Sequence, residues 1–387
     1  MNVFLTGATG FLGGELLVSL AKEKDIKQIY CLVRAKTEDE GRKRVEKIFN
    51  LHKDHYSVDR IIPVVEDLLD DNLTQKLADN KRISDTNVII HSAANTSFSR
   101  IYDTLIEKTN IQGLKKIIDW SKTLKHFDKF TYIGTATICG TGFKDKIVYE
   151  TDSPDMNSQH FVKYTYSKMM GEFMLRENLP QEKLLILRPS IIMGDSRPWV
   201  PRSYVILWTL ASLNLLRLIP VDKDSKLDII PVDYASEAIT KLVMAKNLKY
   251  NTYHVSSGTD SFTTPLRTTT VISKYYNDRP DFKFIDRSFV KQMKFWASGR
   301  LATDNELNNY KNYLDYWEKT MGDKSKIKIL FAGLEPYFEF IELSQIFDNS
   351  RLLSDIDIKQ SPPTHDYVKI CAKYLDNIDI FEGALDP

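Results

Sequence analysis

The chain has 387 residues, of which 42% are hydrophobic, so it can bury a large core in one large or two closely packed domains. Its 53 basic and 52 acidic side chains leave a net charge of +1, which argues against a nucleic-acid partner. Three widely spaced cysteines (Cys31, Cys139 and Cys371) and scattered histidines predict neither a disulfide framework nor a metal site. With no signal-peptide pattern at the N-terminus, a soluble cytoplasmic protein is expected.

Short segments rich in β-formers alternate with helical segments along the first two thirds of the chain. The expected strands are residues 2–6, 28–33, 61–65, 87–91, 129–134 and 184–188. Helical spacing is found at residues 11–23, 72–80, 102–125 and 161–177. This alternation predicts an α/β fold with a Rossmann-type, doubly wound parallel sheet. Residues 228–232 and 252–256 are expected to add two later strands to the same sheet.

From about residue 260 the sequence becomes mostly helical and rich in aromatic residues. We interpret residues 258–387 as a smaller, substrate-binding C-terminal lobe. Residues 1–257 then form the dinucleotide-binding domain, with residues 200–228 contributing to the substrate side.

A glycine-rich loop follows the first expected strand and opens the first helix. It comprises Gly7, Ala8, Thr9, Gly10, Phe11, Leu12 and Gly13. Glycines permit a tight turn and a close backbone approach to a pyrophosphate, whose charge is favoured at a helix N-terminus. A βα turn that binds nothing is the alternative. The position of the loop between a strand and a helix favours a dinucleotide site.

The end of the second strand indicates which coenzyme is used. NAD-specific sites place an acidic residue about 20 positions after the glycine loop, and this sequence has Arg34 there. A guanidinium binds a 2′-phosphate through charge-assisted hydrogen bonds, so NADPH is expected, with Arg44 as a second contact. An arginine that is merely solvated is the alternative.

The next two strand ends supply further cofactor contacts. Asp67, followed by Leu68, can accept a hydrogen bond from the adenine amino group, and the small Ala93 leaves room for the dinucleotide. His91, which precedes it, is interpreted as a packed histidine and not as a catalyst.

The candidate chemistry lies in Tyr164 and Lys168, which share one face of a helix at i and i+4. A nearby ammonium, together with the positive nicotinamide of the oxidised cofactor, is expected to lower the pKa of the phenol from its ordinary value near 10. Tyr166 lacks such a neighbour. Thr135, at the end of the fifth strand, can donate a hydrogen bond to a substrate carbonyl oxygen, with Thr137 as the competing candidate.

Residues 204–221 are almost entirely apolar, but Asn214 and Arg217 interrupt them. A buried or amphipathic helix is expected here and no integral membrane span. Weak contact with a membrane surface, or the lining of a site for an apolar substrate, are the alternatives.

Together these residues resemble the extended short-chain dehydrogenase/reductase superfamily, and within it the fatty acyl-CoA reductase and thioester reductase branch (the male-sterility-type reductases). The similarity to this branch is carried by CLVRA at 31–35, HSAANTSF at 91–98, Asn110, RPSIIMGDS at 188–196, IPVDYASEAI at 230–239 and FDN at 347–349. The sequence departs from the pattern at Gly134, where the family more often has serine.

The resemblance implies an NADPH-dependent reductase that converts a fatty acyl thioester of coenzyme A or acyl carrier protein to the aldehyde, with the alcohol as a further product. Tyr164 and Thr135 would hydrogen-bond the developing oxyanion. Lys168 would orient the nicotinamide ribose, and Asn110 would position Lys168. The segment containing Pro189 and Ser190 would add cofactor contacts.

Two other classes remain open at this stage. The same scaffold serves nucleotide-sugar epimerases and dehydratases as well as hydroxysteroid-type dehydrogenases. A protein that only senses the dinucleotide is the non-enzymatic alternative, although such a protein has no need of the Tyr164 and Lys168 pair.

Overall fold

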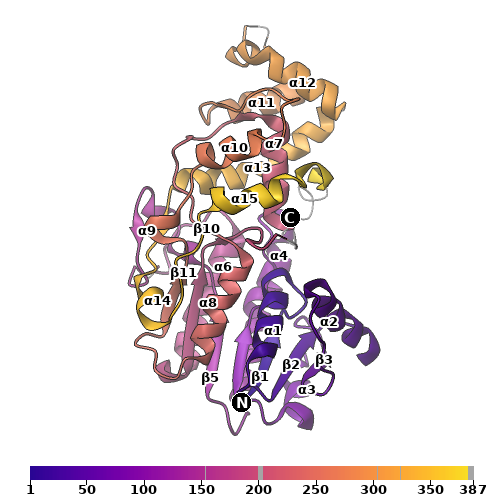
Figure 1. Cartoon of the computed structure of the whole chain (residues 1–387), viewed down its shortest axis with the longest axis vertical. Coiled ribbons are helices and arrows are strands. Elements are labelled where there is room, and N and C mark those ends of the chain that lie inside the picture. Colours follow the sequence, from indigo (N-terminus) through magenta and orange to yellow (C-terminus); the bar gives the residue numbers. More distant parts are fainter. Residues whose placement is uncertain (153, 199–203, 303, 323, 382–387) are drawn as a thin grey trace.

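The computed structural model describes residues 1–152, 154–198, 204–302, 304–322 and 324–381 (Figure 1). Within these residues, seven parallel strands form one sheet in the order β11-β7-β5-β4-β1-β2-β3. Their bounds are β1 Asn2–Thr6, β2 Gln28–Val33, β3 Ile61–Val65, β4 Val88–His91, β5 Lys129–Ile133, β7 Leu184–Pro189 and β11 Thr252–Val255. The predicted doubly wound sheet is confirmed, and its strand order reverses between β1 and β4.

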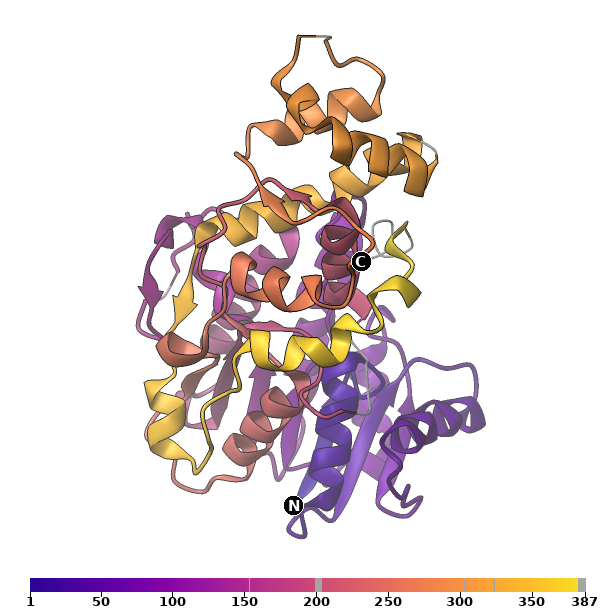
Figure 2. The ribbon, with the colours of Figure 1, turned by 45° about the horizontal axis from the view of Figure 1, so that its top comes forward.

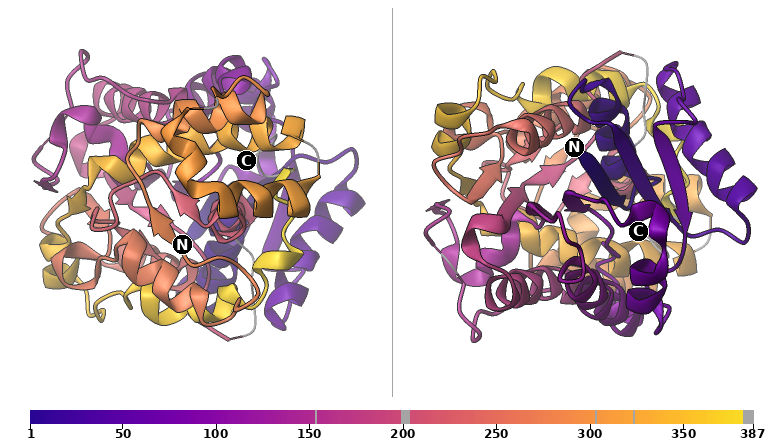
Figure 3. Two further views of the ribbon diagram at one scale, coloured as in Figure 1. Left: turned by 90° about the horizontal axis from the view of Figure 1, so that it is seen from above. Right: turned by 90° about the horizontal axis from the view of Figure 1, so that it is seen from below.

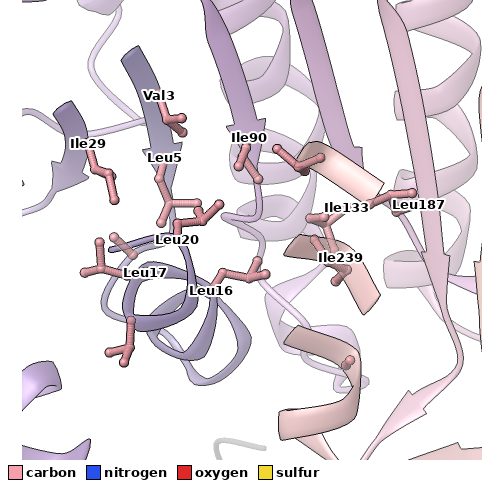
Figure 4. Close-up of a cluster of buried hydrophobic side chains, with 14 of the residues drawn as sticks. Val3, Leu5, Leu16, Leu17, Leu20, Ile29, Ile90, Ile133, Leu187 and Ile239 are labelled. Atoms are coloured by element: carbon pink, nitrogen blue, oxygen red, sulfur yellow. The ribbon is translucent and has the colours of Figure 1, made fainter. Parts of the chain in front are cut away.

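Neighbouring residues of a strand point to opposite faces of the sheet, and helices cover both faces. Both faces are therefore buried. Val3 and Leu5 of β1 pack with α1 (Phe11–Lys22) and α8 (Val232–Met244) on one face (Figure 4). Phe4, between them, packs on the other face with α3 (Leu73–Asp79), α5 (Leu114–Ser121) and α6 (Lys163–Asn178). α2 (Glu38–His52) contributes to the first face.

Two expectations about these elements need correction. β10 (Ile229–Ile230) does not join the large sheet but pairs with β8 (Ile191–Ile192), because the chain has already turned toward the helical lobe. The helix expected over residues 102–125 is not uniform. It consists of η2 Arg100–Tyr102, α4 Asp103–Ile106, the π-helix η3 Glu107–Gly113 and α5, which ends at Ser121.

The later part of the chain is mostly helical, as expected, and lies beyond the carboxyl ends of the strands (Figures 1 and 2). Seen from above, its helices lie over the end of the sheet (Figure 3). They are α7 Tyr204–Leu216, α10 Pro265–Ser273, α11 Phe289–Ala297, α12 Lys311–Met321, α13 Lys324–Leu343 and α15 Thr364–Ala372. α7, α11, α12 and α13 share a core that includes Trp208, Trp296, Trp317 and Phe331. α10 and α15 pack with α7 in a second cluster.

Part of this region returns to the sheet. β13 (Ile346–Phe347) pairs with β6 (Ile147–Val148), and Leu352 of α14 (Ser350–Asp355) is buried in the same cluster as β1 and α1. The proposed boundary near residue 257 stays a prediction. Within the predicted substrate-side segment 200–228, residues 200–203 lie outside the described residues, as do 382–387 at the end of the lobe.

Candidate active site

A cavity of about 760 Å³ opens where the carboxyl ends of the parallel strands meet the helical lobe. Its size lies within the usual range for a ligand site. Its lining includes every residue predicted to bind the dinucleotide: Gly7, Thr9, Gly10, Phe11, Leu12, Gly13, Arg34, Asp67, Leu68, Ala93, Tyr164, Lys168, Pro189 and Ser190. Residues from separate strand ends therefore converge on one site.

The glycine loop is built for close backbone contact. Gly7 has a φ of +73°, and a Cβ atom there would lie 2.8 Å from the Ala93 backbone nitrogen. A Cβ on Gly13 would lie only 2.0 Å from the Gly7 carbonyl oxygen. Gly10 caps α1 without a side-chain hydrogen bond, which leaves the first N–H groups of the helix open toward the cavity. This cradle fits a pyrophosphate.

Two arginines meet at the end of β2. Arg34 and Arg44 both line the cavity, and a guanidinium nitrogen of Arg44 donates to the Arg34 carbonyl oxygen. Arg44 thus fixes the backbone that carries the exposed Arg34 side chain. The arrangement presents two positive charges at the end of the cavity where the sequence predicted a 2′-phosphate.

Residues that follow β3 and β4 also line the part of the cavity predicted to bind the dinucleotide. The Asp67 carboxylate lines the cavity and accepts a hydrogen bond from the Leu69 backbone nitrogen at 3.0 Å. The Thr6 hydroxyl accepts from the Ala93 backbone nitrogen at 3.1 Å and so holds the ends of β1 and β4 together. His91 is 1% exposed and stacks on Tyr132, and burial lowers its pKa to about 3. It is a packed, neutral histidine.

The three candidate catalytic groups lie side by side at the middle of the cavity. Tyr164 and Lys168 come from the first turns of α6, and Thr135 follows β5. The Thr135 hydroxyl hydrogen-bonds the Tyr164 phenol, and its oxygen lies 3.0 Å from the Thr137 hydroxyl. The Lys168 ammonium donates to the Ile133 carbonyl oxygen at 2.7 Å. Thr135 is therefore the threonine that contacts the phenol.

Burial dominates the pKa values of the Tyr164 phenol and the Lys168 ammonium. Burial raises the pKa of Tyr164 to about 12, and the hydrogen bond from Thr135 offsets only part of this. Burial also lowers the pKa of Lys168 to about 7. Desolvation disfavours both charged forms, and the ammonium is directed at a backbone carbonyl. The expectation from the sequence joined the ammonium to the positive nicotinamide of a bound cofactor, so it stays a prediction. The phenol stays protonated at neutral pH and can donate a hydrogen bond.

The burial of Lys168 has a measurable effect on stability. Because its pKa is lower in the folded than in the unfolded chain, unfolding takes up a proton between about pH 7 and the ordinary lysine pKa. The free energy of unfolding should therefore rise with pH in this window and be lowest below it. We expect Lys168→Met to stabilise the fold at pH 6 by an amount on the order of a few kcal/mol, and this gain to shrink by about 1.4 kcal/mol per pH unit above pH 7.

Urea unfolding at pH 6 and pH 9 measures this difference. Lys115→Met is the control, since the Lys115 side chain is 63% exposed on α5. It should give no such gain at either pH. A Lys168→Met effect that is the same at both values would contradict a lowered lysine pKa.

Asn110 does not line the described part of the cavity. It is 2% exposed in the π-helix η3, where its amide exchanges two hydrogen bonds with the Asn95 backbone, at 2.8 and 2.9 Å. The same amide donates to the Ser167 hydroxyl at 2.8 Å. Ser167 is the direct neighbour of Lys168, so the expected role of Asn110 in positioning Lys168, directly or through a water, stays a prediction. Asn110 ties the segment after β4 to α6.

Beyond Thr135 and Tyr164 the cavity continues into an apolar arm in the helical lobe. The arm is lined by Leu210, Leu213, Ile219, Val221, Leu334, Phe338 and Ile341. Leu210 and Leu213 belong to α7, which ends at Leu216 within the segment 204–221, where the sequence left a buried helix, a substrate lining and weak membrane contact as alternatives. The described side chains of α7 are mostly buried and some of them line the cavity, while the lining of a substrate stays a prediction. The side chains of residues 204–206 lie outside the described part.

Some residues at the site were not identified from the sequence. Tyr337 and Phe340 of α13 line the cavity. Glu172, four residues after Lys168, forms a buried two-pronged ion pair with Arg188 of β7, with both nitrogen–oxygen distances 2.7 Å. The pair holds α6 against the sheet behind the catalytic groups. Glu172 lies four residues after Lys168, so the sequence alone could have placed it on the same face of the helix as the predicted catalytic residues.

Among the residues that the structure describes, no group of three or more histidine, cysteine, aspartate or glutamate side chains could hold a metal ion. In the same residues no helix has both the length and the apolar character needed to cross a bilayer.

The fold and the site define a dinucleotide-binding protein of the extended short-chain dehydrogenase/reductase type. A family model described as male sterility protein matches residues 5–239. The chain therefore belongs to the male sterility protein family, which confirms the resemblance to the fatty acyl-CoA reductase branch.

Several curated relatives carry reductase names. The chain is 29% identical to a putative fatty acyl-CoA reductase of Drosophila melanogaster, over 60% of this chain and 50% of that protein. It is 26% identical to human fatty acyl-CoA reductase 1, over 60% and 52% of the two chains. It is 32% identical to part of a linear gramicidin synthase of Brevibacillus parabrevis, over 65% of this chain and 5% of that protein. The chain thus spans about half the length of the two reductases.

Solved structures share the fold. The terminal R domain of the myxalamid biosynthetic pathway superposes with a TM-score of 0.73 at 23% identity, covering 97% of this chain and 91% of that one. UDP-glucuronic acid 4-epimerase from Bacillus cereus, solved with NAD, superposes with a TM-score of 0.63 at 16% identity, covering 97% and 99%. At these identities the similarity establishes the fold alone.

Proposed function

We propose that this protein is an NADPH-dependent reductase of a fatty acyl thioester, carried by coenzyme A or by a carrier protein, and that it releases the aldehyde. The observation that carries the proposal is the continuity of the cavity. It runs from the glycine loop past Thr135 and Tyr164 into the apolar arm. The names of the related fatty acyl-CoA reductases support the same substrate class.

The residues at the loop end of the cavity fit a dinucleotide. Gly7 and Gly13 let the loop pack closely against the chain's own backbone and so form the turn that opens α1 toward the cavity, where a pyrophosphate would bind. Asp67 suits the adenine, and Arg34 with Arg44 suits a 2′-phosphate. When bound, NADPH supplies the hydride for the reduction.

The chain's own groups then act on the substrate oxygen. As the carbonyl carbon gains a hydride, negative charge develops on the oxygen, and the Tyr164 and Thr135 hydroxyls donate hydrogen bonds to it. The raised pKa of Tyr164 keeps the phenol protonated until this charge forms, after which it can give up its proton. The resulting hemithioacetal breaks its carbon–sulfur bond, so the thiol leaves and the aldehyde remains.

Coenzyme preference can be tested at Arg34. NADPH should bind more tightly than NADH, and Arg34→Ala should remove most of that preference. The loss of a charge-assisted hydrogen bond is worth roughly 1.5–3 kcal/mol, which is about one to two decades in affinity. Titrations of both coenzymes into each protein measure the dissociation constants.

The matched control is Arg42→Ala, because Arg42 is an exposed arginine of α2 that is absent from the described cavity lining. This variant should keep the wild-type preference. Equal affinities of the wild type for NADPH and NADH would remove the assignment of Arg34 to a 2′-phosphate site.

The function itself is tested by a screen for NADPH oxidation against acyl-CoA thioesters, fatty aldehydes, sterols and nucleotide sugars, with products identified by mass spectrometry. An aldehyde formed from an acyl thioester supports the proposal, and further conversion to the alcohol would extend it. Turnover of only sterols or nucleotide sugars would replace the proposal with one of the other classes on this scaffold. Dinucleotide binding without turnover of any substrate would favour a sensing role.

A further inference from the structure

A cluster of aromatic rings joins the C-terminal lobe to the candidate catalytic tyrosine. Phe98 lies between β4 and η2, and its ring centre is 6.1 Å from that of Tyr164. The Phe98 ring centre also lies 4.8 Å from the ring centre of Tyr337 and 4.9 Å from that of Phe340, both on α13. These four residues line the cavity. Phe98 is thus the ring between the helical lobe and the phenol.

The backbone that carries Phe98 is held in place. Asn110 bonds both the N–H and the carbonyl of Asn95, and the Asn95 side chain accepts from the Ser97 backbone nitrogen at 3.0 Å. Ser97 in turn accepts from the Ser99 backbone nitrogen at 3.1 Å. Because Asn110 also bonds Ser167 on α6, the position of Phe98 is set relative to the helix that carries Tyr164.

A tyrosine side chain needs two kinds of restraint to present its oxygen accurately. The hydrogen bond with Thr135 restrains the phenol oxygen at the tip of the ring. It does not fix the tilt of the ring about its own bonds to the backbone. A neighbouring ring packed against the phenol ring supplies that restraint, and such aromatic pairs contribute beyond simple burial. Phe98 provides this contact and is itself backed by Tyr337 and Phe340.

We propose that Phe98 is a positioning residue that holds the Tyr164 ring in the orientation required for proton donation, and that α13 of the C-terminal lobe supports it there. The inference rests on the proposed function, since the orientation of the phenol matters for catalysis only if Tyr164 donates to the substrate oxygen. It gives the C-terminal lobe a role at the reacting centre in addition to lining the apolar arm.

The first test is Phe98→Ala. A catalytic group displaced by about 1 Å can cost about 10²-fold in rate, so kcat for a short acyl-CoA thioester should fall by up to that factor. The dissociation constant for NADPH should not change. Phe98→Tyr, which keeps the ring, should restore most of the rate. A Phe98→Ala enzyme with unchanged kcat overturns the proposal.

Phe161→Ala is the matched control. Phe161 also contacts Phe340, at 5.7 Å between ring centres, but it is 36% exposed and does not belong to the described cavity lining. Its removal should leave kcat close to that of the wild type. Equal losses of kcat in the Phe98 and Phe161 variants would point to general loosening of the cluster and overturn the specific role of Phe98.

A double variant separates positioning from other effects of the ring, such as the exclusion of water. If Phe98 acts through the phenol, Phe98→Ala should lower the rate no further in an enzyme that already carries Tyr164→Phe. A full additional loss in that background would show that Phe98 acts independently of Tyr164.

A readout without turnover keeps this proposal distinct from the proposed function. In protein labelled with ¹³C in its tyrosine rings, the Tyr164 signal is assigned by its loss in Tyr164→Phe. The rate at which the Tyr164 ring flips, read from the line shapes of this signal, should rise in Phe98→Ala and stay unchanged in Phe161→Ala. If the wild type reduces no thioester, the proposed function fails, and the flip rate alone decides whether Phe98 restrains Tyr164. An unchanged flip rate in Phe98→Ala overturns the inference in either case.

Discussion

Tyr164→Phe is expected to lower kcat by about 10²–10⁴-fold, the range that general acid catalysis contributes. The substitution keeps the ring and its contact with Phe98 and removes only the hydroxyl that Thr135 holds. The melting temperature and the dissociation constant for NADPH should therefore stay close to those of the wild type. Steady-state kinetics, a melting curve and a coenzyme titration measure the three quantities.

Tyr166→Phe is the matched control for this prediction. Tyr166 lies two residues further along α6 and outside the described cavity lining, where its ring contacts His160 and Lys163. Removing its hydroxyl should change kcat little. If the Tyr166 variant is inactive and the Tyr164 variant active, the assignment of the catalytic tyrosine is wrong.

The second large effect is expected in a series of acyl chain lengths. Each buried methylene contributes about 0.8 kcal/mol, so two more carbons in the apolar arm should raise kcat/KM roughly tenfold and four roughly a hundredfold. The gain should stop once the arm is filled. A flat profile in the wild type would remove the long-chain acyl substrate from the proposal.

Leu213→Trp tests whether α7 forms the wall of the arm. Leu213 is half-buried and lines the cavity, so a larger side chain there should shorten the preferred chain while a short thioester is still reduced. Leu207→Trp is the control on the same helix, because Leu207 is 3% exposed and absent from the described lining. That variant should lose stability through overpacking and should affect all chain lengths alike. Melting curves and kcat/KM for each variant separate the two outcomes.

Much of the site could be predicted because its parts are local in the sequence. The glycine loop is one strand-to-helix turn, Arg34 directly follows a strand, and Tyr164 and Lys168 lie one helical turn apart. A parallel sheet brings the carboxyl ends of its strands to one edge, so the fold class itself places these segments near one another. The cavity lining agrees with that placement.

Features that could not be predicted depend on contacts with residues distant in the sequence. The sequence at β10 is typical of a strand, and the structure pairs this strand with β8. Long-range packing determines which strands pair, and β-propensity does not. Burial raises the pKa of the Tyr164 phenol, and no spacing along the chain reveals how deeply a side chain is buried.

Local order along the chain was thus enough to predict the Rossmann-type sheet, the glycine loop and the placement of Tyr164 and Lys168 at one site, since each depends on contacts within one or two adjacent elements. Only the tertiary structure shows that α7 and α13 close the apolar arm and that Phe98 lies between α13 and the phenol. Phe98 and Tyr337 are separated by more than half of the chain. Contacts between residues so far apart in the sequence arise from the packing of whole helices and strands, and the periodicity of the sequence does not predict them.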